Sequence, residues 1–416
     1  MIVKIEGSTA PDMARWPAVN PRRTFKILMI LHMPWTRDLG GSRVQFELAE
    51  EFRKQGHIVD KFDINDAFPR SNRLTVRFHA AVFHHRAARF VQKHGNSYDI
   101  IDSHQENLPF SKKHLHFHGL LSVRSVGLVH LYDRYLQQVA QSPVRRRRGK
   151  RAMGGRLVRW VVRTLADPVK NAEKSFAEAD CIIVNNQDEY DYVRQSLGYQ
   201  NKLVQLPFGL TDLRLQAFQS NAKNPQQRLA SRQVVFIGYW SPRKGSGDWA
   251  RIIAGVRAQV TGTRFLFLGT GRTADDILQE LGLSSNEWLT IVPHYTSEQL
   301  PMLLGEGTVG AFPTYIEGFP FALLEKLASG LPTVSYDVPG PRETLPLVDA
   351  SLMVPTGNVE HFITRLVQLL RVDEAEYFHL SQRCRDVARM FTWPKIAAET
   401  LDVYSKFLDV LMTESC

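Results

Sequence analysis

Two stretches of the chain each alternate short apolar runs with helix-like segments, and this alternation limits the fold more than any other feature. The apolar runs of the first stretch lie at 26–33, 57–64, 98–104, 120–128 and 179–186. Those of the second stretch lie at 232–238, 263–271, 288–294, 307–314 and 331–340. Strands that alternate with helices form parallel sheets in α/β domains. The pattern therefore predicts two Rossmann-like α/β domains.

The boundaries of these domains follow from the segments between the runs. The chain of 416 residues is too long for one ordinary core. The segment 205–215 carries Pro and Gly and is predicted to be a joint, and the polar stretch 219–232 is predicted to be poor in helix. The predicted parts are an N-terminal extension (1–25), a first domain (26–212), a second domain (213–393) and a C-terminal helix (394–416) that crosses back to the first domain. Because parallel sheets bind ligands beyond the carboxyl ends of their strands, we expect the two domains to face each other across a cleft.

Cysteine usage and hydropathy indicate the compartment. Cys181, Cys384 and Cys416 lie far apart and form no CxxC pair, which argues against a disulfide scaffold or a zinc module. Residues 1–25 lack the apolar core of a secretory signal, and no stretch approaches the length of a transmembrane helix. We expect a cytoplasmic protein, either soluble or peripheral on the inner face of the cytoplasmic membrane.

The net charge of +10 is concentrated in the segment 145–163, which has nine Lys or Arg and no acidic residue. Arg156, Arg159 and Arg163 recur on one face of a predicted helix, and Trp160 belongs to its apolar face. A basic amphipathic helix with a Trp is typical of a helix that lies on an anionic membrane. A solvated basic surface is the alternative, and nucleic acid is disfavoured as a partner.

Three glycine-bearing loops follow predicted strands, where a phosphate could approach the backbone. The pair Gly40 and Gly41 is a weak signal, because Ser42 could simply cap a helix. The loop 238–245 is more informative, since Arg243 and Lys244 place two cations after a strand. The third loop, 269–271, contains two glycines and could equally be a plain turn.

The segment EGFPFALLE (317–325) places two carboxylates eight positions apart. A helix is predicted to begin at Pro320 and to end near Ser329, so that its N-terminus favours negative charge. Glu325 is placed to accept hydrogen bonds from a sugar diol, and Glu317 can reach a second group rich in hydroxyls. A nucleotide diphosphate sugar has these parts in this order.

The same residues carry a resemblance to a known family. The pattern E-G-F-P-x-x-L-L-E, followed by L-A-S-G-x-P-T-V, resembles the E-x7-E signature of retaining glycosyltransferases of the GT-B fold, especially glycosyltransferase family 4. The resemblance covers most of the chain, because the Gly-Gly loop, P-x-G-L, G-x-x-S-P-x-K-G, G-x-G and D-V-P-G-P-R-E occur in family order. It implies that Glu317 contacts the donor sugar, Glu325 the ribose and Lys244 the diphosphate. Other implied or candidate donor-binding residues are Gly318, Phe319, Pro320, Gly238, Tyr239, Gly269, Gly271, Gly40 and Gly41.

Two positions depart from the family pattern. Tyr239 stands where the family commonly has an Arg that contacts the diphosphate, and Arg243 is a candidate to supply that charge. Val126 stands where many relatives have a His, and His104 is the better-placed His of the first domain. The predicted catalytic set is therefore Glu317, Lys244, Arg243 and His104.

The resemblance implies a retaining, hexosyltransferase-type enzyme that moves a sugar from a nucleotide diphosphate to an acceptor hydroxyl. The first domain would bind the acceptor, which we expect to be a saccharide or lipid-linked saccharide in bacterial surface polysaccharide or lipopolysaccharide synthesis. Such enzymes generally need no bound metal, and we expect none, although His114, His116 and His118 would share one face of an extended strand. The alternatives are a GT-B epimerase or phosphorylase and a catalytically silent nucleotide-sugar-binding protein.

Overall fold

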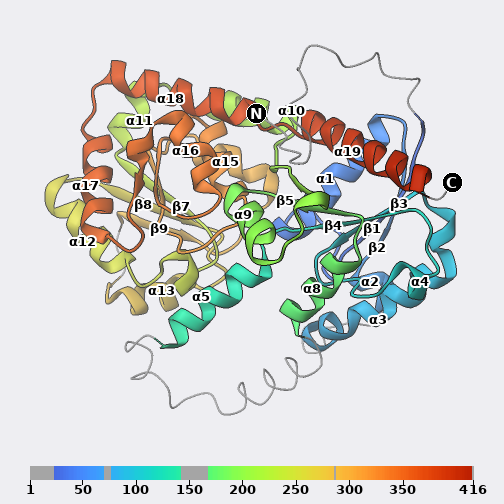
Figure 1. Ribbon diagram of the computed structural model, residues 1–416. Coiled ribbons are helices and arrows are strands. Elements are labelled where there is room, and N and C mark those ends of the chain that lie inside the picture. The colour runs from blue at the N-terminus through green and yellow to red at the C-terminus, as the bar shows by residue number, and fades with distance from the viewer. Residues whose placement is uncertain (1–22, 70–75, 142–166, 285–286, 415–416) are drawn as a thin grey trace. The chain divides into compact units, whose positions relative to one another are not determined.

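The computed structural model describes residues 23–69, 76–141, 167–284 and 287–414 (Figure 1). The chain divides into two compact units, each described by itself below. Unit 1 comprises Met1–Pro207 and Pro394–Cys416, and unit 2 comprises Phe208–Trp393. The basic segment 145–163 lies outside the described residues, so its helix and its membrane contact stay predictions. Within the described residues, no helix is long and apolar enough to cross a membrane.

Unit 1 is built on a six-stranded parallel sheet with the order β2-β1-β3-β4-β5-β6. Its strands are β1 (Lys26–Ile30), β2 (Ile58–Phe62), β3 (Ile100–His104), β4 (Leu120–Arg124), β5 (Cys181–Val184) and β6 (Leu203–Gln205). Its helices are α1 (Gly40–Lys54), α2 (Ile64–Ala67), α3 (Val76–His94), α4 (Lys112–Leu115), α5 (Val129–Gln141), α8 (Pro168–Glu178) and α9 (Gln187–Ser196). The last helix of the chain, α19 (Trp393–Glu414), joins them.

Alternate side chains of the unit 1 strands serve the two faces of the sheet. Leu28 and Ile101 pack with the buried side of α3, in a cluster that includes Phe83. The strand residues that face the other side of the sheet include buried polar groups. One of these, Asp102, binds α19. Arg124 contacts Asp102 at 2.9 Å, and the Tyr404 hydroxyl of α19 donates a hydrogen bond to the same carboxylate. The C-terminal helix is thus tied to the centre of this sheet by a buried ionic cluster.

Unit 2 also has a six-stranded parallel sheet, in the order β12-β11-β10-β7-β8-β9. Counted within the unit, this is the doubly wound order 3-2-1-4-5-6 read from the opposite edge. The strands are β7 (Gln233–Ile237), β8 (Arg264–Leu268), β9 (Leu289–Val292), β10 (Val309–Phe312), β11 (Thr333–Tyr336) and β12 (Met353–Val354). The prediction of two Rossmann-like domains is confirmed.

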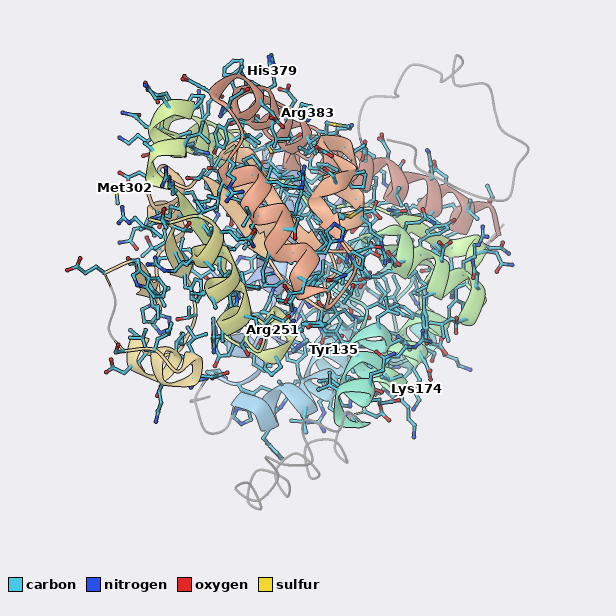
Figure 2. The ribbon with its side chains drawn as sticks, turned by 90° about the vertical axis from the view of Figure 1, so that its left-hand side faces the viewer. Tyr135, Lys174, Arg251, Met302, His379 and Arg383 are labelled. Atoms are coloured by element: carbon cyan, nitrogen blue, oxygen red, sulfur yellow. The ribbon has the colours of Figure 1, made fainter. Side chains whose placement is uncertain are left out.

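The helices of unit 2 cover both faces of its sheet (Figure 1). They are α10 (Asp212–Asn221), α11 (Pro225–Ser231), α12 (Trp249–Gln259), α13 (Ala274–Leu281), α14 (Leu300–Leu304), α15 (Phe321–Ala328), α16 (Pro341–Val348), α17 (Val359–Leu370) and α18 (Glu374–Arg389). Helices α12 and α17 pack together, and Arg251 of α12 reaches the surface (Figure 2) and pairs there with Glu360 of α17 at 2.8 Å. Helix α15 instead packs against α18 and α10.

Three local predictions are wrong. The stretch 219–232 is largely helical, because Thr211 caps α10, Asn224 caps α11, and Pro225 suits the first turn. The pair Gly40 and Gly41 lies in the first turn of α1 rather than in a loop before it, and the cap is Leu39 rather than Ser42. The extended strand that would place His114, His116 and His118 on one face is also absent, because α4 ends there and His116 adopts a left-handed conformation with φ 51°.

Candidate functional site

The strand order of unit 2 reverses between β7 and β10, and parallel sheets bind ligands at such a switch point. The loops after these two strands are fastened together. The Tyr315 N–H donates to the Arg243 carbonyl at 2.9 Å, and the Thr314 hydroxyl donates to the same oxygen at 3.2 Å. Gly245, with φ 78°, lets the first loop approach Pro313, where a Cβ atom would clash with the Pro313 carbonyl.

Glu317 is the centre of a charged cluster at this switch point. Its carboxylate binds the Lys244 ammonium and accepts hydrogen bonds from Arg243 at 3.2 Å and from the Thr314 hydroxyl at 2.6 Å. Burial raises the pKa of Glu317, whereas Lys244 and Arg243 lower it. The two cations outweigh burial, so the pKa of Glu317 lies below its ordinary value. Burial in turn lowers the pKa of Lys244, opposed by Glu317. The cluster is an ion pair with a second cation at its rim.

The loop that contains Glu317 leads into α15, whose N-terminal cap is Pro320. Gly340, with φ 84°, allows this loop to pass closely, since a Cβ atom there would clash with the Gly318 carbonyl. Phe319 packs on Phe391 with ring centroids 5.3 Å apart. The N-terminus of α15 is therefore fixed beside the charged cluster, and a helix N-terminus favours negative charge.

Glu325 lies in α15 and is 4% exposed. Arg214 of α10 reaches its Oε1 atom with Nη2 at 2.9 Å and Nε at 3.2 Å. The Arg214 guanidinium also donates to the Ser297 carbonyl and lies over the Phe218 ring at 4.7 Å. A diol that binds Glu325 would therefore meet a carboxylate already oriented by an arginine.

The remaining predicted donor residues of unit 2 lie on neighbouring strand-end loops. Gly238, Gly269 and Gly271 have positive φ values of 155°, 68° and 64°. Tyr239 is 60% exposed, and its ring lies directly over Gly271, where a Cβ atom would clash with it. Tyr239 thus offers this edge a flat aromatic face and no charge.

Unit 1 has its own strand-end cluster, at the neighbouring strands β1 and β3. His32 Nδ1 contacts Asn107 Oδ1 at 2.9 Å, and His32 Nε2 lies 3.6 Å from Glu106. The His104 ring meets the His32 ring edge-on with centroids 6.0 Å apart. His104 is fully buried, and both of its ring nitrogens lack a hydrogen-bond partner among the described residues. Burial, followed by His32 and Arg124, holds the pKa of His104 well below its usual range.

The predicted site residues fall into three groups: a charged cluster in unit 2, a separate ion pair in unit 2, and residues of unit 1. Glu317, Lys244 and Arg243 meet in one cluster, whereas Glu325 is joined to an arginine that sequence reasoning missed. His104 lies in unit 1, and so do Gly40 and Gly41; Gly41 lies against the Met33 side chain.

Three further residues were not predicted: Arg214, Thr314 and Lys326. Arg214 could have been sought, because a carboxylate in an apolar helix stripe requires a partner. Thr314 has no distinguishing signal in the sequence. Lys326 could have been noticed as a charged residue inside that same apolar stripe. In the part of the chain that the structure describes, no cluster of His, Cys, Asp or Glu could hold a metal ion.

Comparison with known proteins finds sequence relatives for part of the chain. Residues 231–372, about a third of the chain, match the family model Glycosyl transferases group 1. The O-antigen chain mannosyltransferase B of Escherichia coli is 24% identical over 177 residues, which are 41% of this chain and 45% of that protein. A D-inositol 3-phosphate glycosyltransferase of Nocardioides is 26% identical over 189 residues, covering 42% of this chain and 41% of that protein. The matches thus span less than half the length of these two relatives.

Solved structures match nearly the whole chain at the level of the fold. Sucrose-phosphate synthase from Thermosynechococcus elongatus gives a TM-score of 0.69 at 17% identity, over 93% of this chain and all of that one. Anabaena HepE, solved in complex with UDP and glucose, gives 0.61 at 14% identity, over 92% of this chain and all of that one. Both likenesses support the same two-domain fold.

Proposed function

We propose that this protein is a retaining glycosyltransferase that transfers a sugar from a nucleotide diphosphate to an acceptor hydroxyl. The observation that carries the proposal is the cluster of Glu317, Lys244 and Arg243 at the switch point of a doubly wound sheet, beside the N-terminus of α15. Cations and a helix N-terminus suit a diphosphate, and a neighbouring carboxylate suits a sugar hydroxyl. The family match over 231–372 supports the same reading.

In the proposed reaction, the bond between the anomeric carbon and the diphosphate oxygen breaks, and a bond to the acceptor oxygen forms on the same face. The acceptor proton goes to the leaving diphosphate. Lys244 is paired with Glu317 in this structure, and a bound diphosphate would compete for its ammonium. That exchange would free Glu317 to accept a hydrogen bond from the donor sugar, while Lys244 and Arg243 stabilise the charge on the leaving group.

Ligand binding and turnover test the proposal in two steps. UDP-glucose, GDP-mannose and ADP-glucose are screened for a rise in the melting temperature, because a ligand of the native state stabilises it. Any donor that binds is then assayed for sugar transfer or for release of the nucleotide. If none of the three raises the melting temperature and none is turned over, the proposal fails; binding without turnover would leave a nucleotide-sugar-binding protein.

Two carboxamide variants assign the roles of the carboxylates. Glu317→Gln should lower turnover by about 100-fold with little loss of nucleotide affinity, because it removes a charge from the reacting centre. Glu325→Gln should weaken nucleotide binding by about tenfold, since a hydrogen bond to a charged group is worth a few kcal/mol at most. Glu360→Gln is the matched control, because Glu360 also pairs with an arginine but is exposed on α17. Equal effects of the first two variants on turnover and affinity would contradict these assignments.

For the acceptor, we propose a saccharide, lipid-linked at an anionic membrane surface, in the synthesis of a surface polysaccharide. The support is the charge pattern of 145–163 and the likeness to the O-antigen chain mannosyltransferase. The protein should then sediment with vesicles containing phosphatidylglycerol and remain in solution with phosphatidylcholine vesicles. Equal behaviour with both vesicles contradicts the membrane part. Metal-independent transfer stays a prediction, which addition of EDTA to the transfer assay checks.

A further inference from the structure

A second lysine lies behind the charged cluster of unit 2. Lys326 is fully buried in α15, one position after Glu325. Its Nζ atom donates to the Ala311 carbonyl of β10 at 2.9 Å and lies 5.0 Å from the centre of the Phe312 ring. Lys244 lies 5.1 Å from the centre of that same ring. The two amines therefore share one aromatic side chain, and Lys326 is the deeper of the two.

The sheet is adapted to admit the Lys326 side chain. A Cβ atom at position 310 would clash with the Thr333 side chain and would stand 3.0 Å from Lys326 Cδ, so Gly310 leaves space for both side chains. The Lys326 nitrogen has the Ala311 carbonyl as its hydrogen-bond acceptor here, and within the described ranges no carboxylate pairs with it. Isolated ammonium groups are rarely buried, because the loss of hydration costs far more than one carbonyl returns.

The groups that neighbouring elements bring to α15 do not neutralise an ammonium at this position. Arg214 of α10 is itself a cation, and it already pairs with the Glu325 carboxylate. Arg385 of α18 lies beside Gly330, beyond the C-terminal end of the helix. Lys244 adds a further positive charge from the loop after β7. Burial, and then Lys244, lowers the pKa of Lys326 well below its ordinary value.

Two more titratable groups belong to α18, which packs on α15. Burial raises the pKa of Tyr377, and it raises the pKa of Cys384 to about 12, so both are neutral near pH 7. They neither supply a counter-charge to Lys326 nor change their own charge in the physiological range. Compared with Tyr377 and Cys384, Lys326 is therefore the group whose protonation a bound anion can change.

We propose that Lys326 takes up a proton when a nucleotide diphosphate binds beside Lys244, so that binding itself creates a second ammonium behind the site. This inference rests on the proposed function, because it needs the diphosphate at the Lys244 cluster. The anion supplies the negative charge that the buried amine lacks, and Coulomb attraction is strong where water is excluded. The new charge would replace, from behind, the cation that Tyr239 does not provide. On release of the nucleotide, the proton would leave again.

The experiment counts protons during binding. Calorimetric titrations of the full chain with UDP-glucose, GDP-mannose and ADP-glucose are run at about pH 8 in buffers of different ionisation enthalpy, where the diphosphate diester does not itself titrate. The slope of the binding enthalpy against the buffer enthalpy gives the number of protons exchanged. Wild type should take up a proton, approaching one per nucleotide sugar bound. Its affinity should fall as pH rises through the bound-state pKa of Lys326.

Two variants locate the proton. Lys326→Met should abolish the uptake and flatten the pH dependence of affinity, and its thermal unfolding is recorded to show that it folds. Lys202→Met is the matched control, because Lys202 is a half-buried lysine of unit 1 whose pKa burial also lowers. That variant should leave the uptake unchanged.

Each outcome bears on a definite claim. Nucleotide-sugar binding by wild type without proton uptake overturns this inference and leaves the proposed function intact, and it needs no variant to fold. Uptake that persists unchanged in folded Lys326→Met also overturns it. Failure of wild type to bind any of the three donors overturns the proposed function and this inference with it.

Discussion

In unit 1 the ends of β1 and β3 bring together two histidines, an asparagine and one carboxylate, whereas in unit 2 the loops after β7 and β10 pair a carboxylate with two cations. His104 has two ring nitrogens without a partner in the described structure, and its pKa is held low. Glu317, by contrast, is contacted by two cations and a hydroxyl. A site for an anion can hold its charges in mutual pairs until the ligand arrives. A site for a neutral hydroxyl compound needs unpaired donors and acceptors, which cost less to bury than charges.

Removal of one charge in unit 2 should have the largest effect on stability. Lys244→Met leaves Glu317 buried with only the half-exposed Arg243 as a cation. Loss of one partner of a buried ion pair typically costs about 3 kcal/mol. We expect a decrease of about that size in the free energy of unfolding, measured by urea denaturation, together with loss of nucleotide-sugar binding.

The double variant Lys244→Met/Glu317→Gln separates the two roles of the pair. It should regain most of the lost stability, because no uncompensated charge stays buried, and it should remain unable to transfer sugar. If Lys244→Met is as stable as wild type, the pair does not hold the charged cluster together and the contrast with unit 1 is broken.

Removal of His104 from unit 1 should not lower the stability, in contrast to removal of Lys244 from unit 2. His104→Leu deletes two polar atoms that make no hydrogen bond in the described structure, so we expect the stability to stay the same or to rise by about 1 kcal/mol. Transfer should fall while nucleotide affinity is retained, if this histidine meets the acceptor or the donor sugar. His118→Leu, at an exposed position of unit 1, is the control for both measurements.

The pH dependence of stability gives a second readout on His104. Its pKa is depressed in the folded state, so below about pH 6.5 the unfolded chain binds a proton that the native state does not. Wild type should therefore lose stability as pH falls from about 7 to 5, and His104→Leu should lose less. Identical slopes in urea titrations of the two proteins would show that His104 is not the group responsible.

The sequence-based predictions succeeded where a local pattern is enough. Runs of apolar residues placed ten strands within a few residues of their ends, because burial on both faces of a parallel sheet leaves a continuous signal. Glu317, Lys244 and Arg243 could be grouped because each follows a strand end, and strand ends meet at one edge. The capped helices of 212–231 were missed, since their polar composition concealed two good capping residues.

The contacts that the sequence could not reveal join distant segments. Arg214 and Glu325 lie 111 positions apart, and nothing in either local pattern indicates the other. The same holds for Tyr404 and Asp102, 302 positions apart, which fasten the last helix to the first unit. Gly310 of β10 likewise leaves space for Thr333 and for the stem of Lys326, which lie 23 and 16 positions further along the chain. Such pairings are decided by three-dimensional packing, and a single sequence carries no record of them.

The smallest predicted effect comes from the addition of a charge to unit 2. Tyr239 is exposed and lies over Gly271, at the position where the family that the chain resembles commonly has an Arg. Tyr239→Arg should tighten nucleotide-sugar binding by about threefold, because exposed charge pairs contribute at most about 1 kcal/mol. The gain should shrink in high salt, which screens exposed charges.

Tyr239→Gln is the matched control for this variant, because it removes the same ring without adding a charge. Arg243→Ala completes the comparison: if Arg243 already supplies the missing cation, its loss should lower transfer, and Tyr239→Arg in that background should restore part of it. If the transfer rate of Arg243→Ala is unchanged, Arg243 does not supply the cation that Tyr239 lacks. A Tyr239→Arg variant that binds no more tightly than Tyr239→Gln would mean that positive charge is not what limits binding at this edge. The contrast between the charged cluster of unit 2 and the histidines at the strand ends of unit 1 would then rest on Glu317 and Lys244 alone.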